Sequence, residues 1–266
     1  MTQQEAKKEI EQLTEKINYH NDLYYQKNRT QISDLEFDKL LEKLIQLENE
    51  FPQLKDPNSP TQRVGGTITK EFATVYHKYP MLSLSNTYSE KELLDFDVRV
   101  AKGLEGDPYE YFCELKFDGV SISLSYENGS LARGVTRGDG VRGDDVTANV
   151  KTIRSIPLKL KGNAVPPVFE VRGEVFLPKE AFLQLNKERE DIGEERYANA
   201  RNTASGTMKM QDSTEVARRK LDCFVYYLLG DETGLDTHEE SIHKLESWKF
   251  NVSPTYKKCK NIQDVL

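Results

Sequence analysis

Residues 114–137 read ELKFDGVSISLSYENGSLARGVTR, and this stretch contains the clearest strand pattern of the chain. From Val120 to Tyr126, apolar residues alternate with serines, as they do in a half-buried strand. The alternation stops at Asn128-Gly129, a strong signal for a tight hairpin. If these two residues form the loop, four pairs face each other: Glu127 with Ser130, Tyr126 with Leu131, Ile122 with Val135, and Val120 with Arg137. The pattern therefore predicts a hairpin over residues 120–137 that returns Arg137 to Lys116.

Lys116 precedes the hairpin in a setting that favours a reactive amine. The apolar and aromatic run at residues 111–117 predicts a strand, and Asp118-Gly119 predicts a turn, so Lys116 is expected at a strand end. A lysine amine has a reference pKa of about 10.4 and needs nearby cations or desolvation before it can attack. Arg137 and a substrate-bound metal would supply that positive charge. The alternative is a solvated lysine that protects a strand edge.

The composition of the loop after the hairpin favours the interpretation of Lys116 as a reactive amine. Residues 136–145 read TRGDGVRGDD, which is richer in Gly, Arg and Asp than a plain connection requires. Such a loop can approach phosphate groups closely. Cations in the same place would also stabilise charge on a phosphoryl group during transfer.

Four segments, in this order, carry a family resemblance: CELKFDG at 113–119, TRGDG at 136–140, EVRGEVFLP at 170–178 and ANARNTASG at 198–206. Together they closely resemble bacterial NAD-dependent DNA ligase. The resemblance implies that Lys116 attacks the adenylyl phosphorus of NAD, releases nicotinamide mononucleotide (NMN) and passes AMP to the 5′-phosphate of nicked double-stranded DNA. It also implies Mg²⁺ as a cofactor, no metal-binding residues of the protein's own and no obligate protein partner.

The resemblance further implies roles for individual side chains. Asp118 and Arg201 would join Lys116 as catalytic residues. Glu114 would contact the adenine, Glu174 the ribose and Arg137 the nucleotide. Ser83 and Leu84 would line the nucleotide pocket. We expect Arg201 in a polar loop that contains glycine. Other interpretations remain open: Glu174 could face water on an apolar strand, Arg201 could be a solvated residue of its loop, and the charged face that Glu174 shares with Glu170 and Arg172 is ambiguous.

The first sixty residues predict two amphipathic helices. Ile10, Leu13, Ile17 and Tyr24 fall on one stripe, and Ser33-Asp34-Leu35-Glu36 resembles a capping box that opens the second helix. In the family this module binds NMN, and the resemblance assigns that role to Tyr24, Tyr25, Asp34, Leu35, Glu36, Phe37 and Asp38. Aromatic faces and carboxylates suit the cationic nicotinamide ring. Tyr19 is expected to serve packing, and Asp34 could act only as part of the helix cap.

The predicted fold class is α+β: the helical module, residues 1–60, is followed by a linker at 61–70 and a mixed or antiparallel-sheet nucleotidyltransferase domain of the covalent ligase type at 71–266. Further helices are expected at residues 90–104, 181–190 and 237–248, and apolar strands at 168–177 and 223–229. Two strands with lysines, and several further domains of these ligases, are not found in this sequence. We therefore expect a fragment whose own activity is an open question.

Composition limits the remaining possibilities. A hydrophobic content of 37% and a mean hydropathy of −0.68 predict a polar protein without membrane spans, and we expect it in the cytoplasm. The three cysteines are spaced too widely for a zinc site and are expected to be free thiols. The net charge of −7 has the wrong sign for bulk attraction to DNA, but residues 133–161 hold seven basic side chains against three acidic ones.

Departures from the family pattern leave rival functions open. Phe37 stands where a tyrosine is expected, Tyr25 where some relatives have histidine, Ala200 where proline is common, and Lys209 where many have a second arginine. One rival is a covalent nucleotidyltransferase that uses ATP or GTP. The other is an NAD-binding protein without catalytic activity.

Overall fold

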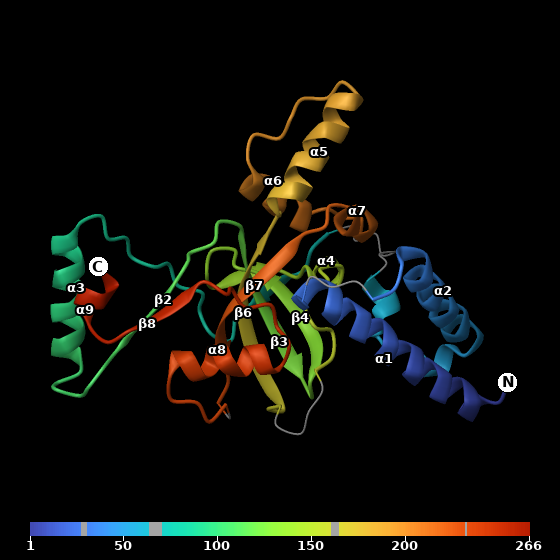
Figure 1. Ribbon diagram of the computed structural model, residues 1–266, viewed down its shortest axis with the longest axis horizontal. Coiled ribbons are helices and arrows are strands. Elements are labelled where there is room, and N and C mark those ends of the chain that lie inside the picture. The colour runs from blue at the N-terminus through green and yellow to red at the C-terminus, as the bar shows by residue number, and fades with distance from the viewer. Residues whose placement is uncertain (28–30, 64–70, 161–164, 232) are drawn as a thin grey trace.

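The computed structural model describes residues 1–27, 31–63, 71–160, 165–231 and 233–266. Figure 1 shows a central sheet with a helical pair, α1 (Gln3–Lys27) and α2 (Asp34–Glu50), at one end of the long axis. At the opposite end lie α3 (Glu90–Gly103) and the short C-terminal helix α9 (Ile262–Val265). The expectation of a helical module followed by an α+β sheet domain is confirmed.

The two N-terminal helices form because each has one apolar stripe. Ile10, Leu13 and Ile17 of α1 are buried against Leu44 and Leu47 of α2. The predicted capping box at the start of α2 is confirmed: the Glu36 backbone N–H donates to Ser33 Oγ at 3.3 Å, and the Ser33 backbone N–H donates to Glu36 Oε2 at 2.9 Å. That backbone hydrogen bond lowers the pKa of Glu36. The Glu36 carboxylate is therefore used by the cap.

Two 3₁₀ helices, η1 (Pro52–Leu54) and η2 (Pro60–Arg63), follow the helical pair. Thr61 in η2 is buried and donates to Glu48 Oε2 at 2.6 Å. The first residues of the predicted linker thus pack on α2, whereas residues 64–70 lie outside the described part of the chain.

The central sheet is antiparallel, with strand order β4-β3-β6-β7. Its strands are β3 (Val120–Glu127), β4 (Ser130–Thr136), β6 (Val168–Phe176) and β7 (Asp222–Leu229). Ile122, Leu124 and Tyr126 alternate onto one face, where Val171 and Val175 join them in the main core. The other face carries serines from β3 and charged residues from β6, and this polar face positions the candidate site.

The predicted hairpin is confirmed at its turn and wrong at its far end. Asn128 and Gly129 have φ values of 49° and 74°, as a type I′ turn requires, and Glu127 pairs with Ser130 and Tyr126 with Leu131. The register then shifts, so that Ser125 pairs with Arg133 and Ile122 with Thr136 rather than with Val135. The extra residue is Ala132, which forms a bulge in β4. As a result, Arg137 lies beside Ser121, whose carbonyl accepts from its backbone N–H at 3.0 Å, and not beside Val120.

Helices and loops cover the apolar face of the sheet. Residues from α4 (Thr147–Val150), α6 (Ala200–Met208), α7 (Ser213–Arg218) and α8 (His238–Ser247) all enter the main core. Asn149 ties α4 to the end of α6, because its amide donates to the Met208 and Met210 carbonyls at 2.9 Å each. The helix α5 (Lys179–Asp191) follows β6, as expected.

An arm connects the sheet to α3 and α9. It consists of β2 (Tyr111–Glu114) paired antiparallel with β8 (Tyr256–Cys259). Near it, the Tyr109 and Tyr111 hydroxyls donate to Asp97 of α3 at 2.8 and 2.6 Å. A further short pair, β1 (Thr74–Tyr76) with β5 (Arg142–Asp144), packs the segment before residue 80 against the loop that follows β4.

Candidate functional site

Lys116 lies two residues beyond the end of β2, in the segment that leads into β3. Its side chain is exposed and makes no hydrogen bond or ion pair with any residue that the structure describes. The neighbouring Phe117 ring, in contrast, packs on the rings of Phe176 and Phe224, with centroid distances of 6.1 and 4.6 Å. The backbone next to the lysine is thus fixed on the sheet while the amine stays accessible.

Glu174 holds the bend at Gly119, three residues after Lys116. Its Oε1 accepts from the Gly119 backbone N–H at 3.1 Å, and its Oε2 accepts from Ser121 Oγ at 2.7 Å. Glu174 is only 8% exposed, so the interpretation that it faces water is wrong. Ser121 was not among the predicted residues, although its place two residues after Gly119 on an alternating strand could have suggested it.

Gly119 is required by this close packing. A Cβ atom added there would lie 2.1 Å from the Val175 carbonyl oxygen and 3.2 Å from Glu174 Cγ. We expect Gly119→Ala to lower the free energy of unfolding by about 1–3 kcal/mol, because a backbone oxygen cannot move aside easily. If NAD labels Lys116, as the resemblance implies, that labelling should slow about tenfold or more, since the segment that carries the lysine is displaced. Urea unfolding and intact-mass kinetics measure the two effects.

A matched control is Gly206→Ala in α6, where an added Cβ meets no atom within 4 Å. This change should stabilise the chain by about 0.5–1 kcal/mol, because alanine favours a helix over glycine. Equal urea midpoints for Gly119→Ala and the unchanged chain would contradict the packing argument.

Arg137 connects the loop after β4 to the segment around residue 83. Its Nη2 donates to Ser83 Oγ at 2.7 Å and its Nε to the Met81 carbonyl at 3.3 Å. The structure therefore brings together Arg137 and Ser83, both of which were predicted at the nucleotide site. Leu84 is 76% exposed.

The same segment is anchored from the polar face of the sheet by Arg172. This side chain donates to the Tyr79 and Pro80 carbonyls at 2.7 and 3.1 Å, and its Nε contacts Glu170 Oε1 at 3.1 Å. The arginine and glutamate side chains are only 12% and 8% exposed. On the charged face of β6, Arg172 and Glu170 thus form a buried ion pair, and Arg172 also holds the backbone at residues 79 and 80, which leads to Ser83.

Glu114, at the end of β2, pairs with a histidine that the sequence analysis did not identify. His238 Nε2 donates to Glu114 Oε2 at 2.7 Å. The imidazole ring meets Phe112 edge-on at 5.3 Å and stacks on Tyr227 at 5.8 Å. No local sequence signal indicated this contact, because His238 is 124 residues away and looks like the first residue of an ordinary capped helix.

Asp118 and Arg201 are brought together, with Arg201 Nη1 lying 3.0 Å from Asp118 Oδ1. The expectation that Arg201 lies in a loop is wrong, because it is the second residue of α6. Asn199 caps this helix by accepting from the Asn202 N–H, and Thr203, Ala204, Thr207 and Met208 are buried on one face. The small polar residues that suggested a loop thus supply the cap and the packed face. Lys209, at the other end, lies 2.9 Å from Asp144.

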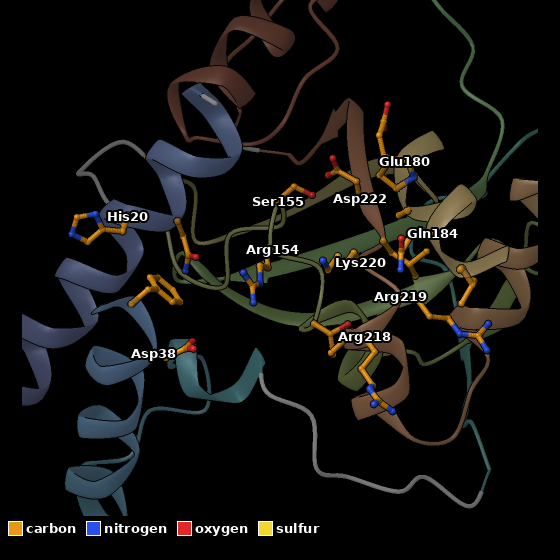
Figure 2. Close-up of a pocket in the computed structure, with 18 of the residues that line it drawn as sticks. His20, Asp38, Arg154, Ser155, Glu180, Gln184, Arg218, Arg219, Lys220 and Asp222 are labelled. Atoms are coloured by element: carbon orange, nitrogen blue, oxygen red, sulfur yellow. The ribbon is translucent and has the colours of Figure 1, made fainter. Parts of the chain in front are cut away.

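The N-terminal helices face a part of the molecule away from Lys116. Phe37 and Asp38 line a cavity of about 870 Å³ whose far side includes Arg154, Lys220 and Asp222 (Figure 2). The described lining of this cavity does not include Lys116 or Glu174. The side chains of Tyr24, Tyr25, Asp34 and Leu35 lie outside the described part of the structure, although their backbones belong to α1 and α2. The structure therefore does not bring Phe37 and Asp38 into one pocket with the lysine.

The basic tract at residues 133–161 is partly paired. Arg133 lies 3.6 Å from Asp145, Arg142 lies 3.4 Å from Asp139, and Lys159 lies 3.0 Å from Asp56 beyond α2. Within the described ranges, no group of three or more His, Cys, Asp or Glu side chains could hold a metal ion, and no helix is both long and apolar enough to cross a membrane.

Comparisons with known families match both parts of the chain. Residues 69–266 match the model of the NAD-dependent DNA ligase adenylation domain. Residues 3–65 match the model of the DNA ligase-like, N-terminal NAD⁺-binding domain. The site therefore belongs to an adenylation domain, and the chain belongs to the NAD-dependent DNA ligase family.

Curated relatives named DNA ligase are similar over almost the whole chain. The protein from Cytophaga hutchinsonii is 58% identical over 266 residues, which is 100% of this chain and 40% of the relative. The protein from Bacteroides fragilis is 56% identical over 261 residues, covering 98% and 39%. The one from Thermotoga petrophila is 51% identical over 263 residues, covering 98% and 38%. The chain thus spans about two-fifths of the length of these relatives.

Proposed function

We propose that this chain carries the adenylation step of an NAD-dependent DNA ligase, and that Lys116 is the nucleophile. The amine would attack the adenylyl phosphorus of NAD, displace NMN and hold AMP through a P–N bond. The observation that carries this proposal is an accessible Lys116, which pairs with no described residue, on a backbone fixed by Phe117 and by the Gly119–Glu174 hydrogen bond. A positioned nucleophile gains most of its advantage from such restriction.

Roles for the surrounding residues follow from where they lie. Arg137, Ser83 and Leu84 would border the nucleotide, with Arg137 supplying positive charge for its phosphates. Glu114, held by His238, would contact the adenine. Glu174 would contact the ribose through the remaining lone pairs of its carboxylate, because each of its two oxygens accepts one hydrogen bond and could accept a second. Its positioning of the bend at Gly119 is the role that these contacts support directly.

The helical module would bind the NMN half of NAD through Tyr24, Tyr25, Phe37, Asp38 and residues 34–36. We propose residues 1–60 as this module, 61–70 as the linker and 71–266 as the nucleotidyltransferase domain. Because Phe37 and Asp38 line a cavity apart from Lys116, the module must move relative to the sheet before both halves of one NAD molecule are held.

Mg²⁺ would bind mainly to the NAD pyrophosphate, since this ion commonly combines substrate phosphates and water with one or two carboxylates. AMP would then pass to the 5′-phosphate of nicked double-stranded DNA. Asp118 and Arg201 lie beside the lysine segment, where they would act on that phosphate. Such a ligase would work in the cytoplasm.

Mass spectrometry tests this function directly. The chain is incubated with Mg²⁺ and either NAD or ATP, and the modified residue is mapped by peptide analysis. We expect one AMP on Lys116 with NAD and none with ATP. Labelling by ATP would favour the rival nucleotidyltransferase, and NAD binding without any lysine adduct would favour the non-catalytic alternative.

A further inference from the structure

Two of the three cysteines meet across the arm that leads to Lys116. Cys113 lies on β2 opposite Lys257, and Cys259 lies on β8 opposite Tyr111, so the two thiols are diagonal neighbours on one face of the strand pair. The Cys113 thiol donates to Cys259 Sγ at 3.9 Å. Cys259 is 2% exposed, whereas Cys113 is only partly buried. Cys223 is buried on β7 in the main core.

We propose that Cys113 and Cys259 form a reversible disulfide in the presence of a peroxide, and that this bond slows adenylation of Lys116. The effect on adenylation rests on the function proposed above, whereas the formation of the bond does not. Cytosolic disulfides, where they occur, are mostly transient and redox-sensing.

The chemistry needs only the two thiols and hydrogen peroxide. The Cys113 thiolate attacks one peroxide oxygen, the O–O bond breaks, and the products are a sulfenic acid and hydroxide, which takes up a proton to become water. The Cys259 thiolate then attacks the sulfenic sulfur, the S–S bond forms, and a second hydroxide leaves and is protonated. Both sulfurs are oxidised, both peroxide oxygens are reduced, and the protein loses two hydrogen atoms.

The surroundings make this pair slow to oxidise under ordinary conditions. Burial, and then the hydrogen bond to Cys259, raise the pKa of Cys113, while Lys257 opposes that change. Because the thiolate is the reactive form, a raised pKa keeps the thiol protonated near neutral pH. The pair therefore responds to a sustained peroxide load, and its oxidation should accelerate as the pH rises.

Bond formation would move the strand that positions the site. Diagonal neighbours in an antiparallel pair have Cα atoms about 7–8 Å apart, whereas disulfides usually span about 4.4–6.8 Å. Closing the bond must therefore draw β2 towards β8. Glu114 follows Cys113 directly, and its contact with His238 spans 2.7 Å, so a shift of this size disturbs the carboxylate and the lysine segment beyond it.

The test uses the reduced chain, treated with increasing hydrogen peroxide and then with an alkylating agent under denaturing conditions. Peptide mapping should find Cys113 linked to Cys259, with Cys223 still alkylated. The rate of AMP attachment from NAD should fall by at least about tenfold, because ångström displacements of reacting groups have effects of that order. Dithiothreitol should restore the rate.

Variants separate this effect from general oxidative damage. Cys259→Ser should adenylate as the reduced chain does and should lose the peroxide effect, whereas the matched change Cys223→Ser should keep both the link and the slowing. Recovery of all three free thiols after peroxide would overturn the proposal, and so would a link that leaves the rate unchanged. If the reduced chain never acquires AMP, the proposed function and the effect on adenylation are both refuted. Peptide mapping of the cysteines would still decide whether the disulfide forms.

Discussion

The Lys116→Arg chain is expected to acquire no AMP from NAD under conditions in which the unchanged chain is labelled. Arginine keeps the positive charge and a similar length, but its guanidinium stays protonated at any working pH and cannot act as a nucleophile. The loss should therefore be complete rather than partial. Intact mass followed by peptide mapping measures it.

This substitution separates nucleophilic chemistry from charge. If Lys116 only attracted the phosphates of NAD, arginine would replace it with little loss. Lys179→Arg, at the exposed start of α5, is the matched control and should be labelled normally. An AMP adduct on another residue of the Lys116→Arg chain would remove Lys116 from the proposed role.

Arg172→Ala should have the largest effect on stability, lowering the free energy of unfolding by about 3–5 kcal/mol. The change leaves the Glu170 carboxylate buried without its cation and removes two hydrogen bonds to the Tyr79 and Pro80 carbonyls. Because these carbonyls lead to Ser83, the segment around residue 83 should also become more mobile. Urea unfolding of both chains gives the stability difference.

The control for this effect is Arg196→Ala, whose side chain is 59% exposed and lies 3.4 Å from Glu190. Exposed pairs of this kind contribute about 0–1 kcal/mol. Adding Glu170→Gln to Arg172→Ala should recover part of the loss, because the buried charge is then removed. If Arg172→Ala costs no more than Arg196→Ala, the buried pair does not stabilise the fold as argued.

Local patterns predicted the elements whose causes are local. The apolar stripe of α1 at Ile10, Leu13 and Ile17, the capping box of α2 and the Asn128-Gly129 turn each depend on residues within one helix or one hairpin, and each is confirmed. The hairpin register failed beyond Ala132, because the alternating residues of β3 and the Asn128-Gly129 turn do not indicate a bulge of one residue in β4.

The contacts of the site depend on long-range packing, which explains what was missed. His238 reaches Glu114, and Cys259 reaches Cys113, only because β8 and the start of α8 lie beside β2. The resemblance placed Glu174, Arg137 and Ser83 in one site, and the structure adds their present partners. The resemblance could not indicate that Arg201 lies in the helix α6 rather than in a loop.

The contact between Asp118 and Arg201 also bears on how the site would receive an anionic substrate. The two side chains are 74% and 61% exposed, so dissolved ions screen their attraction over a Debye length of about 8 Å at physiological ionic strength. Separating such a pair costs little free energy. The guanidinium can therefore exchange its carboxylate for a phosphate without disturbing the helix that carries it. Asp118, two residues from Lys116, would then be a replaceable counterion of Arg201.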